Sequence, residues 1–192
     1  MDLERNTTIE EPVLVDLLQR AQEWSDPAAF DGIYLLYADR IFRYLLARLG
    51  DALMAEEVTS QVFLHLIQKI NLYRIAPKDN VAIFSAWFYR LAYNKMIDIK
   101  RKQRRNQALP IEYAEQVSSG QHVLDQVIER LSVEEVLQKL HVHSAQQREV
   151  ILLRFVVGCN IAETAAIMEK TEGAVKALQH RALDNLRNYF QQ

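Results

Sequence analysis

NIAETAAIMEKTEGAVKALQHRALDNL, residues 160–186, is the stretch that decides the fold. It predicts two helices joined by a tight turn. Asn160 is a favourable N-cap for the first helix, and Glu163 lies three residues on, where its carboxylate can return a bond to the N–H group of the cap. The apolar face of this helix, at helical spacing, consists of Ile161, Ala165 and Met168.

The second helix follows a break at Glu169 and Lys170. Thr171 is its predicted N-cap, and Glu172 places an acid in the first turn, where the helix dipole favours negative charge. Its predicted buried stripe consists of Val175, Leu178, Ala182 and Leu186. The polar side chains left on another face are Lys176, Gln179, His180 and Arg181. Such a pair is typical of a helix-turn-helix, whose second helix can lie in the major groove of DNA, and the alternative is a helical hairpin inside an all-α protein.

The composition favours an all-α protein with two small helical domains. The 192 residues are 49% hydrophobic and include only five Gly and four Pro. The net charge is only −2, but the acidic and basic residues are unevenly distributed along the chain. Residues 1–70 hold 12 acids against six Lys and Arg, whereas residues 100–105 (KRKQRR) hold five basic residues in six. Such asymmetry lets one face meet DNA and another meet a basic partner.

Several classes of site find no support in the sequence. The single cysteine, Cys159, excludes an internal disulfide and a Cys-rich zinc site, and we expect it to be buried. His141 and His143 stand two apart in a predicted loop, so no metal site is predicted. No long apolar run or signal-peptide pattern occurs, which predicts a cytoplasmic protein. Because there is no Walker loop, dinucleotide fingerprint or nucleophile elbow, we expect neither a cofactor nor an enzymatic activity.

Helical spacing of apolar residues runs through most of the chain. Helices are predicted at residues 12–24, 27–49, 51–70, 84–105, 123–140 and 144–157. The core residues of the last of these are predicted to be Val150, Ile151, Leu153 and Phe155. The segment 106–121 loses the helical period and contains Pro, Ser and Gly, so it is the predicted linker. The chain is therefore divided into a domain at 11–105, a linker at 106–121 and a second domain at 122–192.

The helix predicted at 84–105 has a polar face and a basic end. The polar face consists of residues spaced by four, four and three: Arg90, Asn94, Asp98 and Arg101. A stripe of this kind is most often a solvated face, but Asn and Asp are only modest helix formers. Next to the Lys100–Arg105 cluster, they suit contact with phosphates and unstacked bases.

In this order, the features resemble a bacterial RNA polymerase sigma factor of the sigma-70 family. The resemblance is to the compact extracytoplasmic-function type (ECF, group four), which keeps only domains two and four. AEEVTSQVF (55–63) is similar to the segment of the family that binds core polymerase. FSAWFYRLAYNKMIDIKRKQRR (84–105) is similar to the helix that melts and reads the minus-ten element. QQREVILLRFVVGCNIAETAAIMEKTEGAVKALQHRALDNLR (146–187) is similar to the domain that reads the minus-thirty-five element.

The resemblance implies three sets of site residues. Those facing the clamp helices of the largest polymerase subunit would be Glu56, Glu57, Val58, Gln61 and Phe63. Those at the minus-ten element would be Asn94 and Asp98 on the non-template strand, with Lys100, Arg101, Lys102, Arg104 and Arg105 on phosphates. Those at the minus-thirty-five element would be Thr171, Glu172, Lys176, Gln179, His180 and Arg181, with Arg148 and Arg154 as phosphate clamps. Gln can pair with an adenine edge, and Lys can reach guanine.

The implied function is promoter-specific transcription initiation, with core RNA polymerase and promoter DNA as partners. An anti-sigma factor would be a further partner, and no membrane partner is expected. The chain departs from the family at Ser60-Gln61, where Gln-Glu is usual, and at Glu169-Lys170, where Gly and an apolar residue are usual. One alternative is a stand-alone helix-turn-helix transcriptional regulator, which leaves the helix at 84–105 unexplained. Another is a helical interaction protein that sequesters a partner and binds no DNA.

Overall fold

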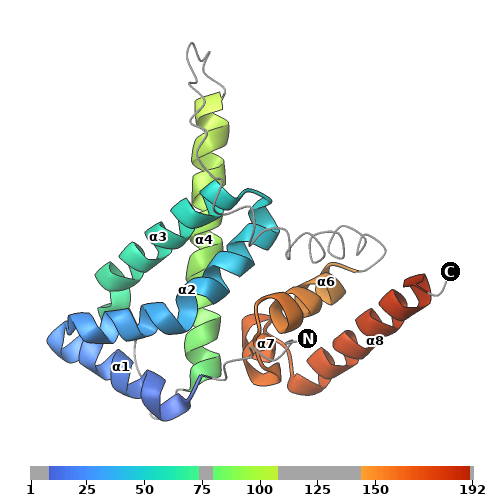
Figure 1. Ribbon diagram of the computed structural model, residues 1–192, viewed down its shortest axis with the longest axis horizontal. Coiled ribbons are helices and arrows are strands. Elements are labelled where there is room, and N and C mark those ends of the chain that lie inside the picture. The colour runs from blue at the N-terminus through green and yellow to red at the C-terminus, as the bar shows by residue number, and fades with distance from the viewer. Residues whose placement is uncertain (1–8, 74–79, 108–143, 191–192) are drawn as a thin grey trace.

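The computed structural model describes residues 9–73, 80–107 and 144–190, and every regular element in these ranges is helical (Figure 1). The prediction of an all-α fold is confirmed. The predicted linker, apart from its first two residues, lies outside the described ranges, as do the predicted helix at 123–140 and the two histidines at 141 and 143. Within these ranges, no helix combines the length and apolarity needed to span a membrane.

The first half of the chain is a bundle in which α2, α3 and α4 pack on one another and α1 covers α2 (Figure 1). Its elements are α1 (Glu11–Trp24), α2 (Pro27–Leu49), α3 (Ala52–Lys69), the short 3₁₀-helix η1 (Ile70–Leu72) and α4 (Val81–Gln107). The last turns of α4 project beyond the other helices (Figure 1). The basic end of this helix is therefore held away from the bundle.

Local signals set the ends of these helices. Gly50 adopts the left-handed conformation, with a φ of 65°, which ends α2. Asp51 accepts a hydrogen bond from the Met54 N–H at 2.9 Å and begins α3. Asn80 accepts a hydrogen bond from the Ile83 N–H at 3.0 Å. This cap begins α4 three residues earlier than the apolar spacing predicts.

An aromatic cluster holds α2, α3 and α4 together. Tyr37 of α2 meets Phe84 and Phe88 of α4 edge to face, with ring centroids 5.4 Å apart in both pairs. Phe63 of α3 meets Phe88 at the same distance. Edge-to-face contacts of this kind add to the free energy gained by burying the rings. The cluster fixes where the polar faces of α3 and α4 point.

The second half of the chain contains the helix-turn-helix. Its elements are α6 (Ala145–Ile151), the π-helical segment η3 (Leu152–Val156), α7 (Ile161–Ile167) and α8 (Glu172–Phe190). The predicted apolar faces of the two helices pack on each other, since Ala165 of α7 lies in one cluster with Val175 and Leu178 of α8. Phe155, predicted in the core, is 54% exposed. The prediction is wrong because the wider π-turn changes which residues face inward.

Both caps of the helix-turn-helix are confirmed. Asn160 and Glu163 form the reciprocal capping box, each side chain accepting a hydrogen bond from the other's N–H group at 2.8 Å. Thr171 accepts a hydrogen bond from the Ala174 N–H at 3.2 Å. Between the helices, Glu169 adopts the left-handed conformation with a φ of 54°. A residue other than Gly is uncommon there.

The two halves of the chain pack directly on each other. α7 lies against α4 (Figure 1). The π-helical segment η3 contacts α2. From the second half, Leu153, Val157 and Cys159 are fully buried in the same cluster as the core of the first half. Part of the second half therefore belongs to the core of the first half, whereas the contact between α7 and α8 forms a separate cluster.

Candidate nucleic-acid interface

The polar face of α8 is open to solvent. Thr171 and Glu172 at its start are exposed, as are Lys176, His180 and Arg181. The buried stripe of Val175, Leu178 and Ala182 lies on another side of the helix. Two intrahelical pairs organise the face: Lys176 lies 4.0 Å from Glu172, and His180 lies 2.7 Å from Asp184. The structure thus brings the predicted residues together on a surface that a DNA groove could reach.

Gln179 is the one member of this set that is half-buried. Its Oε1 accepts a hydrogen bond from Arg154 Nε at 3.0 Å. Arg154 also donates to the backbone carbonyl of Cys159, so this guanidinium is held inside the domain. In this form Gln179 is primarily a donor, which weakens the expectation of a bidentate pair with adenine, because that pair also requires the oxygen.

The C-terminal half of α4 carries the predicted minus-ten residues. Asn94 and Asp98 are exposed on the same face, and Arg101 follows them. Lys100 is half-buried, and its ammonium donates to the backbone carbonyl of Arg48 at 3.3 Å. Lys102 is exposed, and Arg104 and Arg105 lie in the last turns of the helix. Exposed Asn and Asp beside basic residues form a surface suited to single-stranded nucleic acid.

The residues predicted to bind polymerase differ in their exposure to solvent. Glu56 and Glu57 are exposed, and Gln61 donates to the Glu57 carboxylate at 3.1 Å. Val58 is fully buried and Phe63 is only 7% exposed. Both form part of the core cluster, so their side chains are covered in this structure, and their role in binding polymerase stays a prediction.

Sequence reasoning missed an apolar stripe next to the two acids. Leu53 and Leu64 of α3 are more than half exposed, and Ile67 is half exposed. Together with Glu57 and Ser60, these three residues recur along α3 at spacings of four, three, four and three. All five therefore lie on one side of the helix. This spacing was available in the sequence. The prediction did not include this stripe because the neighbouring stripe through Val58 has the same helical spacing.

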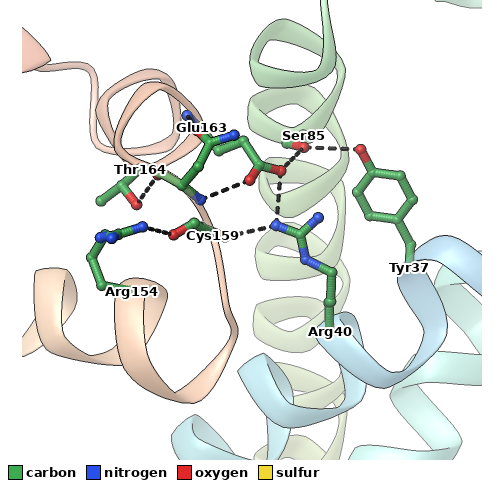
Figure 2. Close-up of polar contacts among 8 residues, drawn as sticks. Tyr37, Arg40, Ser85, Arg154, Cys159, Glu163 and Thr164 are labelled. Atoms are coloured by element: carbon green, nitrogen blue, oxygen red, sulfur yellow. Dashed lines mark hydrogen bonds and ion pairs between the residues drawn. The ribbon is translucent and has the colours of Figure 1, made fainter. Parts of the chain in front are cut away.

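A buried polar network between the two halves was also missed (Figure 2). Glu163 Oε1 accepts hydrogen bonds from Arg40 at 2.8 Å and from the Ser85 hydroxyl at 2.9 Å. The Ser85 and Tyr37 hydroxyls are 2.9 Å apart, and Arg40 also lies 3.4 Å from the Cys159 sulfur. Burial raises the pKa of the Cys159 thiol to about 11 and raises the pKa of Tyr37. Residues from α2, α4 and α7 are thus joined without solvent.

Comparison with known proteins identifies the family. The model of sigma-70 region 2 matches residues 33–106, and the model of sigma-70, region 4, matches residues 136–188. The ECF RNA polymerase sigma factor SigD of Mycobacterium tuberculosis is 36% identical over 153 residues, which cover 77% of this chain and 70% of SigD. The chain belongs to the ECF sigma factors of the sigma-70 family.

The ECF sigma factor BldN of Streptomyces coelicolor is 33% identical over 174 residues. The match covers 90% of this chain but 64% of BldN, so this sigma factor spans somewhat less than two thirds of that relative. Among solved structures, the chain is similar to CnrH in complex with the cytosolic domain of CnrY, with a TM-score of 0.62 and 20% identity. The match covers 93% of this chain and 97% of that one. At that identity the likeness shows a shared fold.

The candidate residues lie within the two matched ranges. Region 2 includes α3 and nearly all of α4, and region 4 includes α6, α7 and most of α8. In the described ranges, the structure holds no group of three or more His, Cys, Asp or Glu side chains that could bind a metal ion. The exposed chemistry is that of a binding protein: acids and apolar residues on α3, and polar and basic residues on α4 and α8.

Proposed function

We propose that this ECF sigma factor docks on core RNA polymerase through α3 and directs it to promoters through α4 and α8. The observation that carries the proposal is the exposure of three separate faces on regions 2 and 4 of one sigma-70 chain. Glu56 and Glu57 lie beside the exposed Leu64 and Ile67, which suits a basic and partly apolar partner.

At the minus-ten element, Asn94 and Asp98 would contact bases of the opened non-template strand. Arg101 and Lys102, both exposed, would hold the adjacent phosphates and fix the register of the helix. Melting then needs no covalent chemistry, because capture of unstacked bases stabilises the open strand. The polymerase would carry out the catalysis.

At the minus-thirty-five element, α8 would enter the major groove with its N-terminal residues first. Lys176 and Arg181 would contribute base or phosphate contacts, and Gln179 would donate from its amide group. Arg154 would act as a positioning residue for Gln179, because its guanidinium holds the amide oxygen. An anti-sigma partner stays a prediction, since the solved sigma factors found in such complexes share the fold at only 20% identity.

The test is co-purification with bacterial core RNA polymerase. The wild-type chain should be retained, and a Glu56→Lys/Glu57→Lys variant should lose most of that binding, because it places positive charge against a basic partner. The matched control is Glu10→Lys/Glu23→Lys, which changes the charge equally at two exposed positions outside α3. If the folded wild type does not bind polymerase but binds promoter duplex alone, the stand-alone regulator becomes the better description.

A further inference from the structure

The exposed face of α8 carries two pairs of acidic and basic side chains, and the two pairs differ in geometry. His180 Nδ1 lies 2.7 Å from Asp184 Oδ2, which is a hydrogen-bonding distance. Lys176 Nζ lies 4.0 Å from Glu172 Oε2, which is beyond the usual length of a hydrogen bond. Within the described part of the chain, Glu172 and Lys176 therefore keep their hydrogen-bonding groups free for a ligand, whereas the Asp184 carboxylate is already engaged by His180.

Both side chains of the longer pair are well exposed, and the helix beside them is open. Glu172 and Lys176 are 57% and 65% exposed. Gly173 lies between them in the sequence, and a Cβ atom built there would meet nothing within 4 Å. Gly32 of α2 is different, because a Cβ atom there would come within 2.7 Å of Leu17. Packing thus requires a glycine at position 32 but not at position 173, and the space beside the start of α8 is accessible to a ligand.

A carboxylate on a surface that approaches DNA needs a partner there. Phosphates repel it, and an exposed ion pair with Lys176 contributes little to stability. The groups of the major groove from which a carboxylate can accept a hydrogen bond are the amino groups of cytosine and adenine. Glu172 is the first residue of α8, and the N-terminal residues of the second helix of a helix-turn-helix are those that contact base edges. Its position therefore favours contact with a base over contact with the DNA backbone.

The pair of Glu172 and Lys176 matches the major-groove edge of one base pair. In a C·G pair, the N4 amino group of cytosine donates to O6 of guanine, and the two atoms lie about 3 Å apart. A carboxylate and an ammonium group that lie 4.0 Å apart can therefore contact both atoms. The ammonium gains a second acceptor, because guanine also presents N7 beside O6, whereas thymine presents O4 alone next to a methyl group. This difference favours C·G over the otherwise similar A·T pair.

We propose that Glu172 and Lys176 together read one C·G base pair of the minus-thirty-five element. Glu172 accepts a hydrogen bond from N4 of the cytosine, and Lys176 donates to O6 and N7 of the guanine. This role rests on the proposed function, in which α8 enters the major groove. It adds the base pair that the start of the helix selects, and it gives the acidic residue there a part in promoter specificity.

The test uses the full chain bound to bacterial core RNA polymerase. A library of DNA duplexes, randomised over the length of a promoter, is selected for binding to the wild-type complex and sequenced. Competition experiments then measure the affinity for each of the four base pairs at every selected position. The wild type should prefer C·G at one position of the minus-thirty-five element by about tenfold or more. Glu172→Ala and Lys176→Ala should each reduce that preference to about twofold or less, and at the same position.

Two further variants separate base reading from a general effect of charge. Glu172→Lys/Lys176→Glu exchanges the acceptor and the donor, so the preference at this position should move from C·G to G·C. Asp184→Ala is the matched control, because it removes a carboxylate from the same helix but one that His180 already engages, and it should leave the C·G preference unchanged. Glu172→Ala should also bind unrelated duplex more tightly, since a charge that phosphates repel is lost. Misfolding cannot weaken binding to the selected promoter and strengthen binding to other DNA at the same time.

Three results would overturn the reading of a C·G pair by Glu172 and Lys176. They are an unchanged preference in both single variants, a loss of preference at two different positions, and a swapped variant that still prefers C·G. If the wild-type chain binds core polymerase but the complex selects no minus-thirty-five element, the proposed role of α8 fails together with this reading. If the wild type selects such an element and the Glu172 and Lys176 variants select the same one, the proposed function stands and only the reading of C·G is refuted.

Discussion

The two helices of the helix-turn-helix have different surroundings. α7 is covered on two sides, by α8 and by α4, and its Glu163 is enclosed by residues of region 2. α8 buries one stripe and leaves Lys176, His180 and Arg181 exposed. The shorter helix therefore connects the regions, and the longer one keeps its reading surface free. Changes in α7 should affect stability, whereas changes on the polar face of α8 should affect DNA binding.

The largest effect is expected at the buried carboxylate. Glu163→Gln keeps a capping oxygen but leaves the Arg40 charge buried without a counter-charge, so the free energy of unfolding should fall by roughly 3 kcal/mol. Glu172→Gln, at the start of α8, should change it by less than about 0.5 kcal/mol, since that carboxylate is exposed. Urea denaturation measures both. Equal effects would show that α7 is not covered by region 2 in solution.

The helix caps give a second contrast. Asn160→Ala removes one half of the capping box, and it should lower the free energy of unfolding by about 1–2 kcal/mol. Thr171→Ala removes a single longer bond at 3.2 Å in an exposed position, and the loss should be about 0.5 kcal/mol. Thermal and urea unfolding of the two variants would rank them. A larger loss at Thr171 would reverse the proposed division of roles between the helices.

The turn between the helices allows a double-mutant cycle. In an Arg90→Ala background, Glu169→Gly should raise the free energy of unfolding by about 1 kcal/mol, because Gly accepts the left-handed conformation without strain. With Arg90 present, Glu169→Gly also removes the exposed Arg90–Glu169 ion pair, which contributes at most about 1 kcal/mol to stability. The gain in the free energy of unfolding should be smaller by that amount. If the gain is the same in both backgrounds, the pair contributes nothing to stability.

The smallest change in stability is expected on the open face of α8. Lys176→Ala should leave the free energy of unfolding within about 0.5 kcal/mol of the wild type. If Lys176 contacts a phosphate, the same substitution should weaken promoter binding and lower the slope of log affinity against log salt by about one. Fluorescence anisotropy of the polymerase complex with promoter DNA over a series of salt concentrations measures this slope. An unchanged slope would remove Lys176 from the phosphate contacts.

Local signals in the sequence were enough for the helix-turn-helix. Asn160, Glu163 and Thr171 act within three residues of their partners, so pattern and spacing predicted their caps correctly. Phe155 was misplaced because the predicted spacing assumes α-helical turns, and η3 is a π-helix. The local sequence pattern does not predict a π-helical segment.

The site was predicted only in part. Motif resemblance located the stretch around Glu56 and Glu57 but could not tell which of its residues face inward, and so it included the buried Val58 and Phe63. The three ion pairs between the two halves, Arg40–Glu163, Arg48–Glu149 and Arg90–Glu169, could not be predicted at all. Their partners are separated by about 80 to 120 residues, and the sequence holds no period that relates them.

One bond between the regions ends on the backbone. Arg43 of α2 donates to the carbonyl oxygen of Val156 in η3 at 2.8 Å. Every amino acid carries this carbonyl, so mutations at position 156 that preserve the π-turn keep the acceptor. Over evolutionary time this bond depends on the identity of residue 43 alone, whereas each ion pair depends on two residues. Random drift should therefore erase the ion pairs sooner than this bond.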